Sequence, residues 1–144
     1  WTQEEYSLKR RLVRFFWDQV GCDLFITFEP VKQNEYQLNF SVVSCIFDQP
    51  HGKFFFTSVD FINLFEKIVD AKFKIDEKNR IRRNLQSLKP ITITKQENRD
   101  FFNLIMEFPT PKPRNIEKNV KVFGWSSLPQ AFFKIMSKYS CDFT

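Results

Sequence analysis

The stretch from Glu35 to Thr57, EYQLNFSVVSCIFDQPHGKFFFT, determines the class of fold that this chain can adopt. Leu38, Phe40 and Val42 alternate with polar residues, which is the pattern of a strand with one buried face. DQPHGK then brings the proline and glycine of a turn, and KFFFT is a second run of strand-forming residues. Strand, turn and strand in this order predict an antiparallel β-hairpin.

The segments before this hairpin predict one helix and a further strand. CDLFITFEP (residues 22–30) is rich in strand formers and extends the hairpin into a meander. Thr2 and Glu5 have the spacing of a capping box, which predicts a helix from there to about Gln19, ended by Gly21. The apolar residues that share one face of this predicted helix are Leu12, Val13, Phe16 and Val20.

The segments after the hairpin predict four helices and two strands. They are a helix capped by Ser58 that runs to Asp70, a helix over Lys78–Pro90, a strand at 91–94, a helix at 98–108, a proline-rich loop at 109–119, a strand at 120–125 and a last helix from Ser126 or Ser127. The predicted fold class is α+β, an antiparallel β-hairpin or meander packed with about five helices, with a helix-turn-helix or winged-helix-like part. We find no repeat and no linker, so residues 1–144 are expected to form a single domain, and the start at Trp1 indicates a domain of a longer protein.

The composition gives no support for an enzyme, a metal site or a cofactor. The chain has one histidine, and its three glycines do not form a phosphate-binding loop. Cys22, Cys45 and Cys141 are far apart and odd in number, so neither a zinc site nor a disulfide framework is expected. No apolar run has the length of a membrane span. We therefore expect no small-molecule substrate and no membrane, which leaves a binding function.

Positive charge is concentrated in one third of the chain. The net charge is +5, but residues 1–77 hold 9 basic and 12 acidic residues, a balance of −3. Residues 78–121 hold 11 basic and 4 acidic residues, a balance of +7. This asymmetry points to an acidic partner, with nucleic acid favoured over an anionic membrane surface.

The predicted helix Lys78–Pro90, KNRIRRNLQSLKP, carries five positive charges and no negative one. Ile81, Leu85 and Leu88 fall on one face and would anchor it, while arginine, asparagine and glutamine occupy the opposite face. Side chains of these types can make bidentate contacts to guanine and adenine edges in the major groove. The alternative interpretation is an ordinary solvated basic face. The residues predicted to contact bases are Asn79, Arg80, Arg82, Arg83 and Gln86.

A second basic element is formed by the loop and strand over residues 109–121. Its prolines stiffen an extended segment, which lowers the entropic cost of ordering it on a phosphate backbone; the alternatives are a surface turn or a docking segment for another protein. A further cluster, KRRLVR (residues 9–14), either contacts phosphate or pairs with acidic groups of the same domain. The residues predicted to contact phosphate are Lys78, Lys89, Lys112, Arg114, Lys118 and Lys121.

Several strings resemble families of fungal transcription factors. VVSCIF, KFFFTSVDFINLF, RRNLQSLKP and VKVFGWSSLP resemble the DNA-binding domain of STE-like factors, whose late block is matched in register by Lys121, Val122, Phe123, Trp125, Ser127 and Pro129. A closer resemblance, to the Medusa-type developmental regulators of filamentous fungi, covers almost the whole chain. It rests on WTQEE, RRLVRF, EKNRIRRNL, PKPRNIEKNVKVFGW and KYS.

The resemblance implies a nuclear protein that binds double-stranded DNA, works with transcription co-regulators and controls genes of development, sporulation or filamentation. Two departures from the STE-like pattern, RNLQSLKP for RNLKP and TSVD for TGTD, mean that the target DNA sequence does not carry over. The sequence therefore predicts a sequence-specific duplex-DNA-binding domain of a fungal transcription regulator. The alternative is a protein-interaction module that tethers a corepressor or coactivator to another DNA-bound factor.

Overall fold

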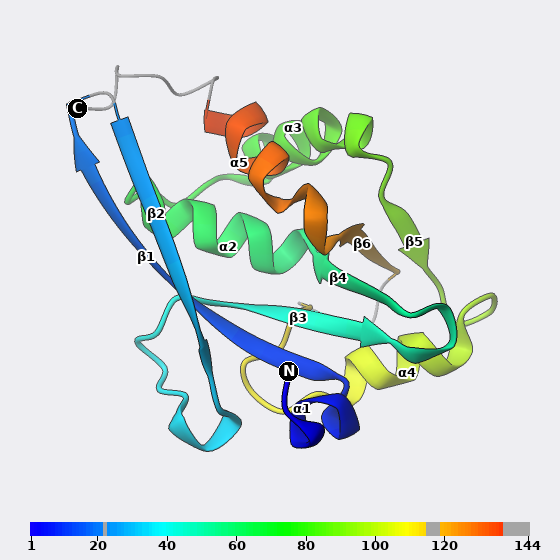
Figure 1. Cartoon of the computed structure of the whole chain (residues 1–144). Coiled ribbons are helices and arrows are strands. Elements are labelled where there is room, and N and C mark those ends of the chain that lie inside the picture. Colours follow the sequence, from blue (N-terminus) through cyan, green and yellow to red (C-terminus); the bar gives the residue numbers. More distant parts are fainter. Residues whose placement is uncertain (22, 115–118, 137–144) are drawn as a thin grey trace.

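The computed structural model describes residues 1–21, 23–114 and 119–136, which form an antiparallel six-stranded sheet with helices against it (Figure 1). The strands are β1 (Arg10–Val20), β2 (Asp23–Val31), β3 (Val42–Asp48), β4 (Lys53–Thr57), β5 (Ile91–Ile93) and β6 (Val120–Gly124). They lie in the order β2-β1-β3-β4-β6-β5, and every neighbouring pair is antiparallel. The predicted β-hairpin is present as β3 and β4, but β1 lies between β2 and β3, so the meander expected from residues 22–57 is not formed.

The described α-helices agree in number with the prediction of about five, which confirms the α+β class. They are α1 (Gln3–Leu8), α2 (Ser58–Ile68), α3 (Ile75–Leu85), α4 (Arg99–Glu107) and α5 (Leu128–Met136). The described residues also form four short 3-10 helices: Gln33–Glu35, Gln49–His51, Gln86–Leu88 and Trp125–Ser127. None of the helices within the described ranges is long and apolar enough to cross a membrane.

Both faces of the central strands are buried: successive side chains along a strand point to opposite sides, and each side packs into its own core. Phe56 and Phe123 lie in the larger core with residues of α2, α3 and α5, and we call this side the α2 face. Phe55 and Val122, their neighbours in sequence, lie in a second core with α4, and we call this side the α4 face. A sheet covered on both sides requires the continuous aromatic and aliphatic runs that its central strands contain.

The helix predicted from Thr2 to about Gln19 is wrong beyond its first turns. The Thr2–Glu5 capping box is present, but α1 ends at Leu8 because Lys9 adopts a left-handed conformation with φ 59°. The residues that follow form β1, since their aromatic and β-branched side chains favour a strand and supply apolar residues to both of its faces. Gly21, expected to end the helix, has φ 62° in the short connection to β2, where a tight hairpin needs a positive φ.

The strand predicted from Glu35 to Phe47 begins only at Val42. Residues 36–41 lack strand structure, and the amide of Phe40 donates to the carbonyl of Gln37 at 2.9 Å. Leu38 is 82% exposed, so the apolar alternation that predicted a strand here does not correspond to a buried face. The rest of the predicted hairpin, the turn at 49–52 and β4, is confirmed.

Two helix starts also differ from the prediction. α2 is capped by the Thr57 hydroxyl, which accepts from the Asp60 amide at 3.1 Å, and not by Ser58. The last helix begins with a 3-10 turn over Trp125–Ser127 before α5 starts at Leu128. Thr57 is also the last residue of β4, so the start of α2 is set by where this strand stops.

The guanidinium of Arg10 is buried and ties β1 to two distant segments. Its Nη1 donates to the Pro111 carbonyl at 2.7 Å, and its Nη2 donates to the Pro109 carbonyl at 3.2 Å and to the side-chain oxygen of Gln33. The group also lies 4.6 Å from the centre of the Phe108 ring. Burial lowers the pKa of Arg10 to about 10, so it stays protonated at neutral pH and can hold these carbonyl oxygens.

Asp60, at the start of α2, has a buried carboxyl group that contacts the backbone of Ser44. Its Oδ2 accepts from the Ser44 amide at 2.8 Å, which fastens α2 to β3. Burial raises the pKa of Asp60 to about 7, although the Ser44 amide and the charge of Arg10 act in the opposite direction. Near neutral pH this carboxyl is therefore close to its point of half-ionisation.

We expect Asp60→Asn to flatten the pH dependence of stability. Because burial raises the pKa of Asp60 in the folded state, the neutral carboxyl contributes stability that is fully present below the unfolded-state pKa of 3.8. This contribution is lost as the pH rises to about 7. The loss can reach about 1.4 kcal/mol per pH unit. Urea unfolding of both proteins at several pH values from 5 to 8 measures it. Parallel curves for the two proteins would show that Asp60 does not titrate in this window.

Candidate nucleic-acid interface

α3 is anchored as its sequence predicts. Ile81 is 3% exposed and Leu85 is fully buried, and both lie in the core of the α2 face. The helix packs chiefly against α5 and α2, beside which it lies in Figure 1. Its first turn carries Asp76 and Glu77, where negative charge suits the positive end of a helix.

The predicted helix continues past Leu85, but not as an α-helix. Gln86–Leu88 form a 3-10 turn, and Lys89 ends it in a left-handed conformation with φ 57° before β5 begins. This turn contains the two residues, Gln86 and Ser87, that separate RNL from LKP in the sequence. The extra residues are thus accommodated by tightening the last turn, which keeps Leu88 half-buried against the core.

The five residues predicted to contact bases differ in their accessibility. Asn79, Arg80, Arg83 and Gln86 are exposed and lie on the side of α3 opposite Ile81 and Leu85. Arg82 is half-buried, and its Nη1 donates to the side-chain oxygen of Asn79 at 3.1 Å. Arg82 therefore orients Asn79, and the other four side chains form the accessible stripe.

The described residues provide no ion-pair partner for the cations of α3. The two ion pairs found within the described ranges join Arg11 to Glu5 and His51 to Asp48, both far from this helix. Acidic residues three or four positions from a basic one form the usual pairs of a solvated helix. Asp76 and Glu77 have this spacing from Arg80, but no acidic residue has it from Arg82 or Arg83. Here the positive charges of the last two turns stay available for an external anion.

The residues predicted to contact phosphate are divided between the two faces of the sheet. Lys78 and Lys89 belong to α3 and its end, and Lys121 is on β6 with its side chain on the α2 face, between two residues that point to the α4 face. These three lie on the same side of the sheet as the exposed stripe of α3. Lys118 lies outside the described residues.

The proline-rich loop is on the opposite side, so the structure does not place it beside α3. Arg10 and Thr57 hold it there through the carbonyls of residues 109, 111 and 113, and both side chains belong to the α4 face. Lys112 is exposed, but the Nη2 of Arg114 donates to the Met106 carbonyl at the end of α4 at 2.9 Å. Arg114 thus fastens the loop to α4, which is a structural role.

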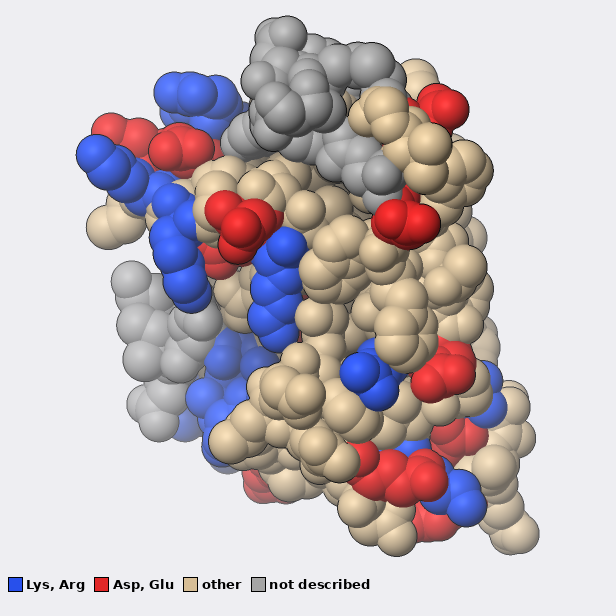
Figure 2. Space-filling view, turned by 90° about the vertical axis from the view of Figure 1, so that its left-hand side faces the viewer, with Lys and Arg blue, Asp and Glu red and all other residues tan. Residues whose placement is uncertain are grey.

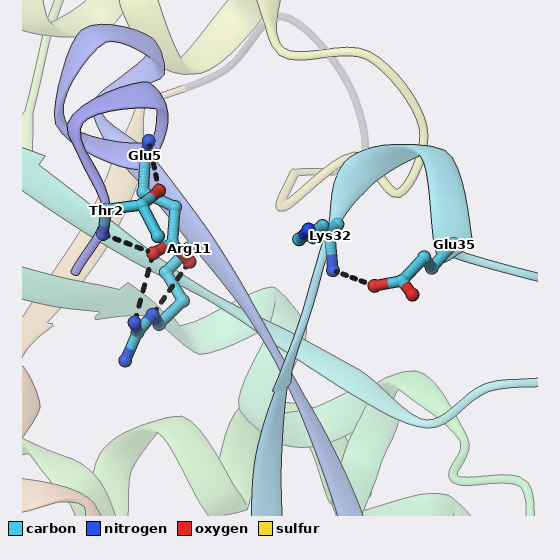
Figure 3. Close-up of polar contacts among 5 residues, drawn as sticks. All are labelled: Thr2, Glu5, Arg11, Lys32 and Glu35. Carbon is cyan, nitrogen blue, oxygen red and sulfur yellow. Dashed lines mark hydrogen bonds and ion pairs between the residues drawn. The ribbon is translucent and has the colours of Figure 1, made fainter.

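The basic cluster at residues 9–14 is also used within the domain, which favours the second of its two interpretations. Arg11 forms hydrogen bonds of 2.7 and 3.0 Å with the carboxylate of Glu5, which Thr2 also holds (Figure 3). The pKa of Glu5 is lowered to about 2, chiefly by Arg11. Arg14 lies 3.6 Å from the centre of the Phe40 ring, and Arg10 is buried.

Two exposed lysines that the sequence analysis did not assign to the interface precede α3. Lys72 and Lys74 are exposed on either side of the buried Phe73, whose amide donates to the carboxylate of Glu66 at 2.7 Å. They lie in the acidic part of the chain by sequence, but they lead directly into the basic helix. The alternation of lysine with an aromatic residue in AKFK was the available signal.

The connection between α2 and α3 differs from that of a typical helix-turn-helix. Residues 69–74 separate the two helices, whereas the turn of that motif has three or four residues. α3 is followed by the edge strand β5, and α4 comes between β5 and β6. The fold is therefore an α+β domain in which a basic helix is the outer layer of a covered antiparallel sheet.

The chain belongs to the family described as Domain of unknown function (DUF7082), whose model matches residues 1–136. No curated protein and no solved structure matches the chain. The match covers every described helix and strand, so the architecture given above is that of the family's domain in this chain.

We predict that Leu85→Ala and Gln86→Ala, two adjacent truncations on α3, have very different effects. Leu85 is fully buried, so its truncation should lower the free energy of unfolding by about 2–5 kcal/mol. Gln86 is exposed, and its truncation should change this free energy by less than about 0.5 kcal/mol. Urea unfolding measures both. Equal losses would mean that the buried and exposed sides of α3 are assigned incorrectly.

Proposed function

We propose that this domain binds duplex DNA in a sequence-specific manner, with α3 in the major groove. The observation that carries the proposal is the exposed stripe of Asn79, Arg80, Arg83 and Gln86 on a helix anchored from behind by Leu85. Arginine, asparagine and glutamine can each make two hydrogen bonds to one base edge, and the major groove admits a single helix. A helix that forms the outer layer of its face can enter a groove without a change of fold.

The charges around the stripe support the same partner. Lys78, Lys89 and Lys121 lie on the side of the sheet that α3 covers, where they would contact the phosphates that flank the groove. Lys72 and Lys74 add two further cations at the start of the helix. Asp76 and Glu77 lie between them and the stripe, so the polyanion would lie along the last two turns of α3.

The resemblance of the sequence to Medusa-type and STE-like regulators supports the wider proposal. A nuclear fungal regulator of development, sporulation or filamentation, acting with co-regulator proteins, needs one surface for DNA and others for proteins. The position of the loop 109–114 on the α4 face gives it a different neighbourhood from α3. We therefore assign the base contacts to α3 alone.

Selection from randomised duplexes at near-physiological salt should enrich a motif with the wild-type domain. Arg83→Ala should relax the preference at one base position and weaken binding of the selected duplex by about 1–3 kcal/mol, or about 5- to 150-fold. Arg99→Ala is the matched control, because Arg99 is an exposed arginine on α4, across the sheet from α3. It should leave both the motif and the affinity unchanged.

Two outcomes would contradict the proposal. The first is the absence of an enriched motif for a domain whose circular dichroism shows that it is folded. The second is an equal loss of affinity in Arg83→Ala and Arg99→Ala, since a non-specific electrostatic contact would not distinguish the two arginines.

The salt dependence of binding tests whether the duplex touches one side of the sheet. Each phosphate contact contributes about −0.9 to the slope of log K against log salt concentration. Lys89→Ala should therefore reduce the magnitude of the slope by about 1, whereas Lys112→Ala, on the α4 face, should leave it unchanged. Fluorescence anisotropy at several salt concentrations gives the slopes. A smaller slope in Lys112→Ala would extend the interface to the proline-rich loop.

A second candidate function is a protein-interaction module that tethers a corepressor or coactivator. The observation that favours it is the edge strand β2, which is nine residues long and carries exposed aromatic side chains. The two functions use different surfaces of the domain and are compatible.

A further inference from the structure

The hydrogen bonds of β1 define which of its residues face which neighbour. The Phe15 amide donates to the Ser41 carbonyl at 2.8 Å, and the Phe47 amide donates to the Lys9 carbonyl at 2.9 Å. In both bonds an odd-numbered residue, Phe15 of β1 or Lys9 just before it, is joined to β3 or the residue that precedes it. Because the N–H and C=O groups of successive residues point to opposite sides in an antiparallel ladder, the even-numbered residues of β1 bond to β2.

The register then identifies the groups at the outer edge of β2. Phe16 pairs with Thr27, so the odd-numbered residues of β2 bond to β1 and the even-numbered residues face away from it. No strand lies beyond β2 within the described ranges. Pro30, an even-numbered residue, has no N–H to offer, as is common on edge strands. The residues with both N–H and C=O at this edge are Leu24, Ile26 and Phe28.

The odd-numbered side chains beside this edge are two acidic residues with an aromatic residue and a threonine between them. Leu24 and Ile26 pack toward the core of the α2 face, so the odd-numbered residues point to the α4 side. Phe25 is 56% exposed there. The four odd-numbered side chains of this row are exposed: Asp23, Phe25, Thr27 and Glu29.

The β1–β2 hairpin has no positive charge near its turn. Residues 15–29 contain three carboxylates and no basic residue. Arg14 pairs with Glu29 across the strands, but its guanidinium stacks on Phe40, and no ion pair between Arg14 and Glu29 is found among the described residues. Figure 2, which looks onto this side of the molecule, shows an uncharged surface interspersed with separate acidic and basic side chains.

Neither strand edge of a second copy fits the row. Two β2 strands paired antiparallel about Ile26 would set Asp23 against Glu29, and like charges directly opposite destabilise a sheet. The opposite edge, β5, has only three residues, and Lys89 just before it has φ 57°, which interrupts an extended segment. A partner therefore has to supply a longer strand with basic residues.

We propose that the edge of β2 binds an extended segment of another protein by adding a strand to the sheet. Asp23 and Glu29 are six residues apart on one face, with Phe25 and Thr27 between them. The complementary segment has a basic residue at positions i and i+6 and apolar or β-branched residues at i+2 and i+4. Backbone bonds to the even-numbered residues supply affinity, and the cross-strand pairs supply specificity. This inference does not depend on DNA binding by α3.

The probe is a synthetic seven-residue peptide with lysine at both ends, isoleucine at the third and fifth positions and threonine elsewhere. In the free protein, amide hydrogen exchange should be fast at Ile26 and Phe28 and slow at Phe25 and Thr27. Saturating peptide should slow the exchange of Ile26 and Phe28. A control peptide with glutamate at both ends should bind at least about tenfold more weakly in an NMR titration, because it meets Asp23 and Glu29.

Phe28→Pro and Phe28→Ala form a matched pair of variants. Both remove the side chain, but only the proline removes the N–H that faces the edge. Relative to Phe28→Ala, Phe28→Pro should bind the lysine peptide about 2- to 10-fold more weakly, as expected for the loss of one hydrogen bond. Duplex-DNA affinity should be equal in the two variants, and thermal unfolding verifies that both are folded.

Three results would overturn the inference. The first is that the lysine and glutamate peptides bind equally well, or that neither binds at millimolar concentration. The second is equal peptide affinity in the two Phe28 variants. The third is fast amide exchange at Phe25 and Thr27 in the free protein. Sedimentation at several concentrations adds a fourth: self-association of the wild-type domain that Phe28→Pro abolishes would assign the edge to a second copy.

Discussion

The buried guanidinium of Arg10 is the interaction on which the arrangement of the surfaces depends. It joins β1 to carbonyl groups of the loop about one hundred residues later and to Gln33, which follows β2. A cation removed from water must keep such partners, because leaving it unpaired in the interior is expensive. The loop is therefore fixed on the α4 face, and its basic residues are separated from α3.

This separation gives the domain distinct surfaces rather than one basic patch. α3 faces outward on the α2 face with cations that no described carboxylate neutralises. The hairpin end extends beyond β3, which pairs with β1 only as far as Arg14. Beyond the hydrogen bond from Phe15 to Ser41, the described residues pair β1 with β2 alone, and residues 15–29 carry carboxylates but no basic side chain. The basic helix α3 and the acidic end of the β1–β2 hairpin are thus separate regions of the surface.

The sequence predicted those elements whose local signals agree with one another. Ile81 and Leu85 repeat at helical spacing and are buried as expected, and KFFFT forms β4. The prediction of a helix to about Gln19 was wrong because residues 10–20 carry apolar side chains on both sides, a pattern that fits a helix and a buried strand equally well. The choice was made by pairing with β2 and β3, which local spacing does not contain. The stripe of α3 was predictable for the same reason as its anchors, whereas the placement of Lys112 and Arg114 was not.

The sequence by itself determined the α+β class, the buried and exposed sides of α3 and the concentration of positive charge in one part of the chain. These follow from periodicity and composition, which act over a few residues or over the whole chain without reference to contacts. Tertiary structure alone decided that β1 is a strand, that the proline-rich loop lies across the sheet from α3, and that β2 is an edge. Each depends on contacts between residues distant in sequence, such as the hydrogen bond from Arg10 to Pro111. Such contacts form only when the sheet brings those residues together.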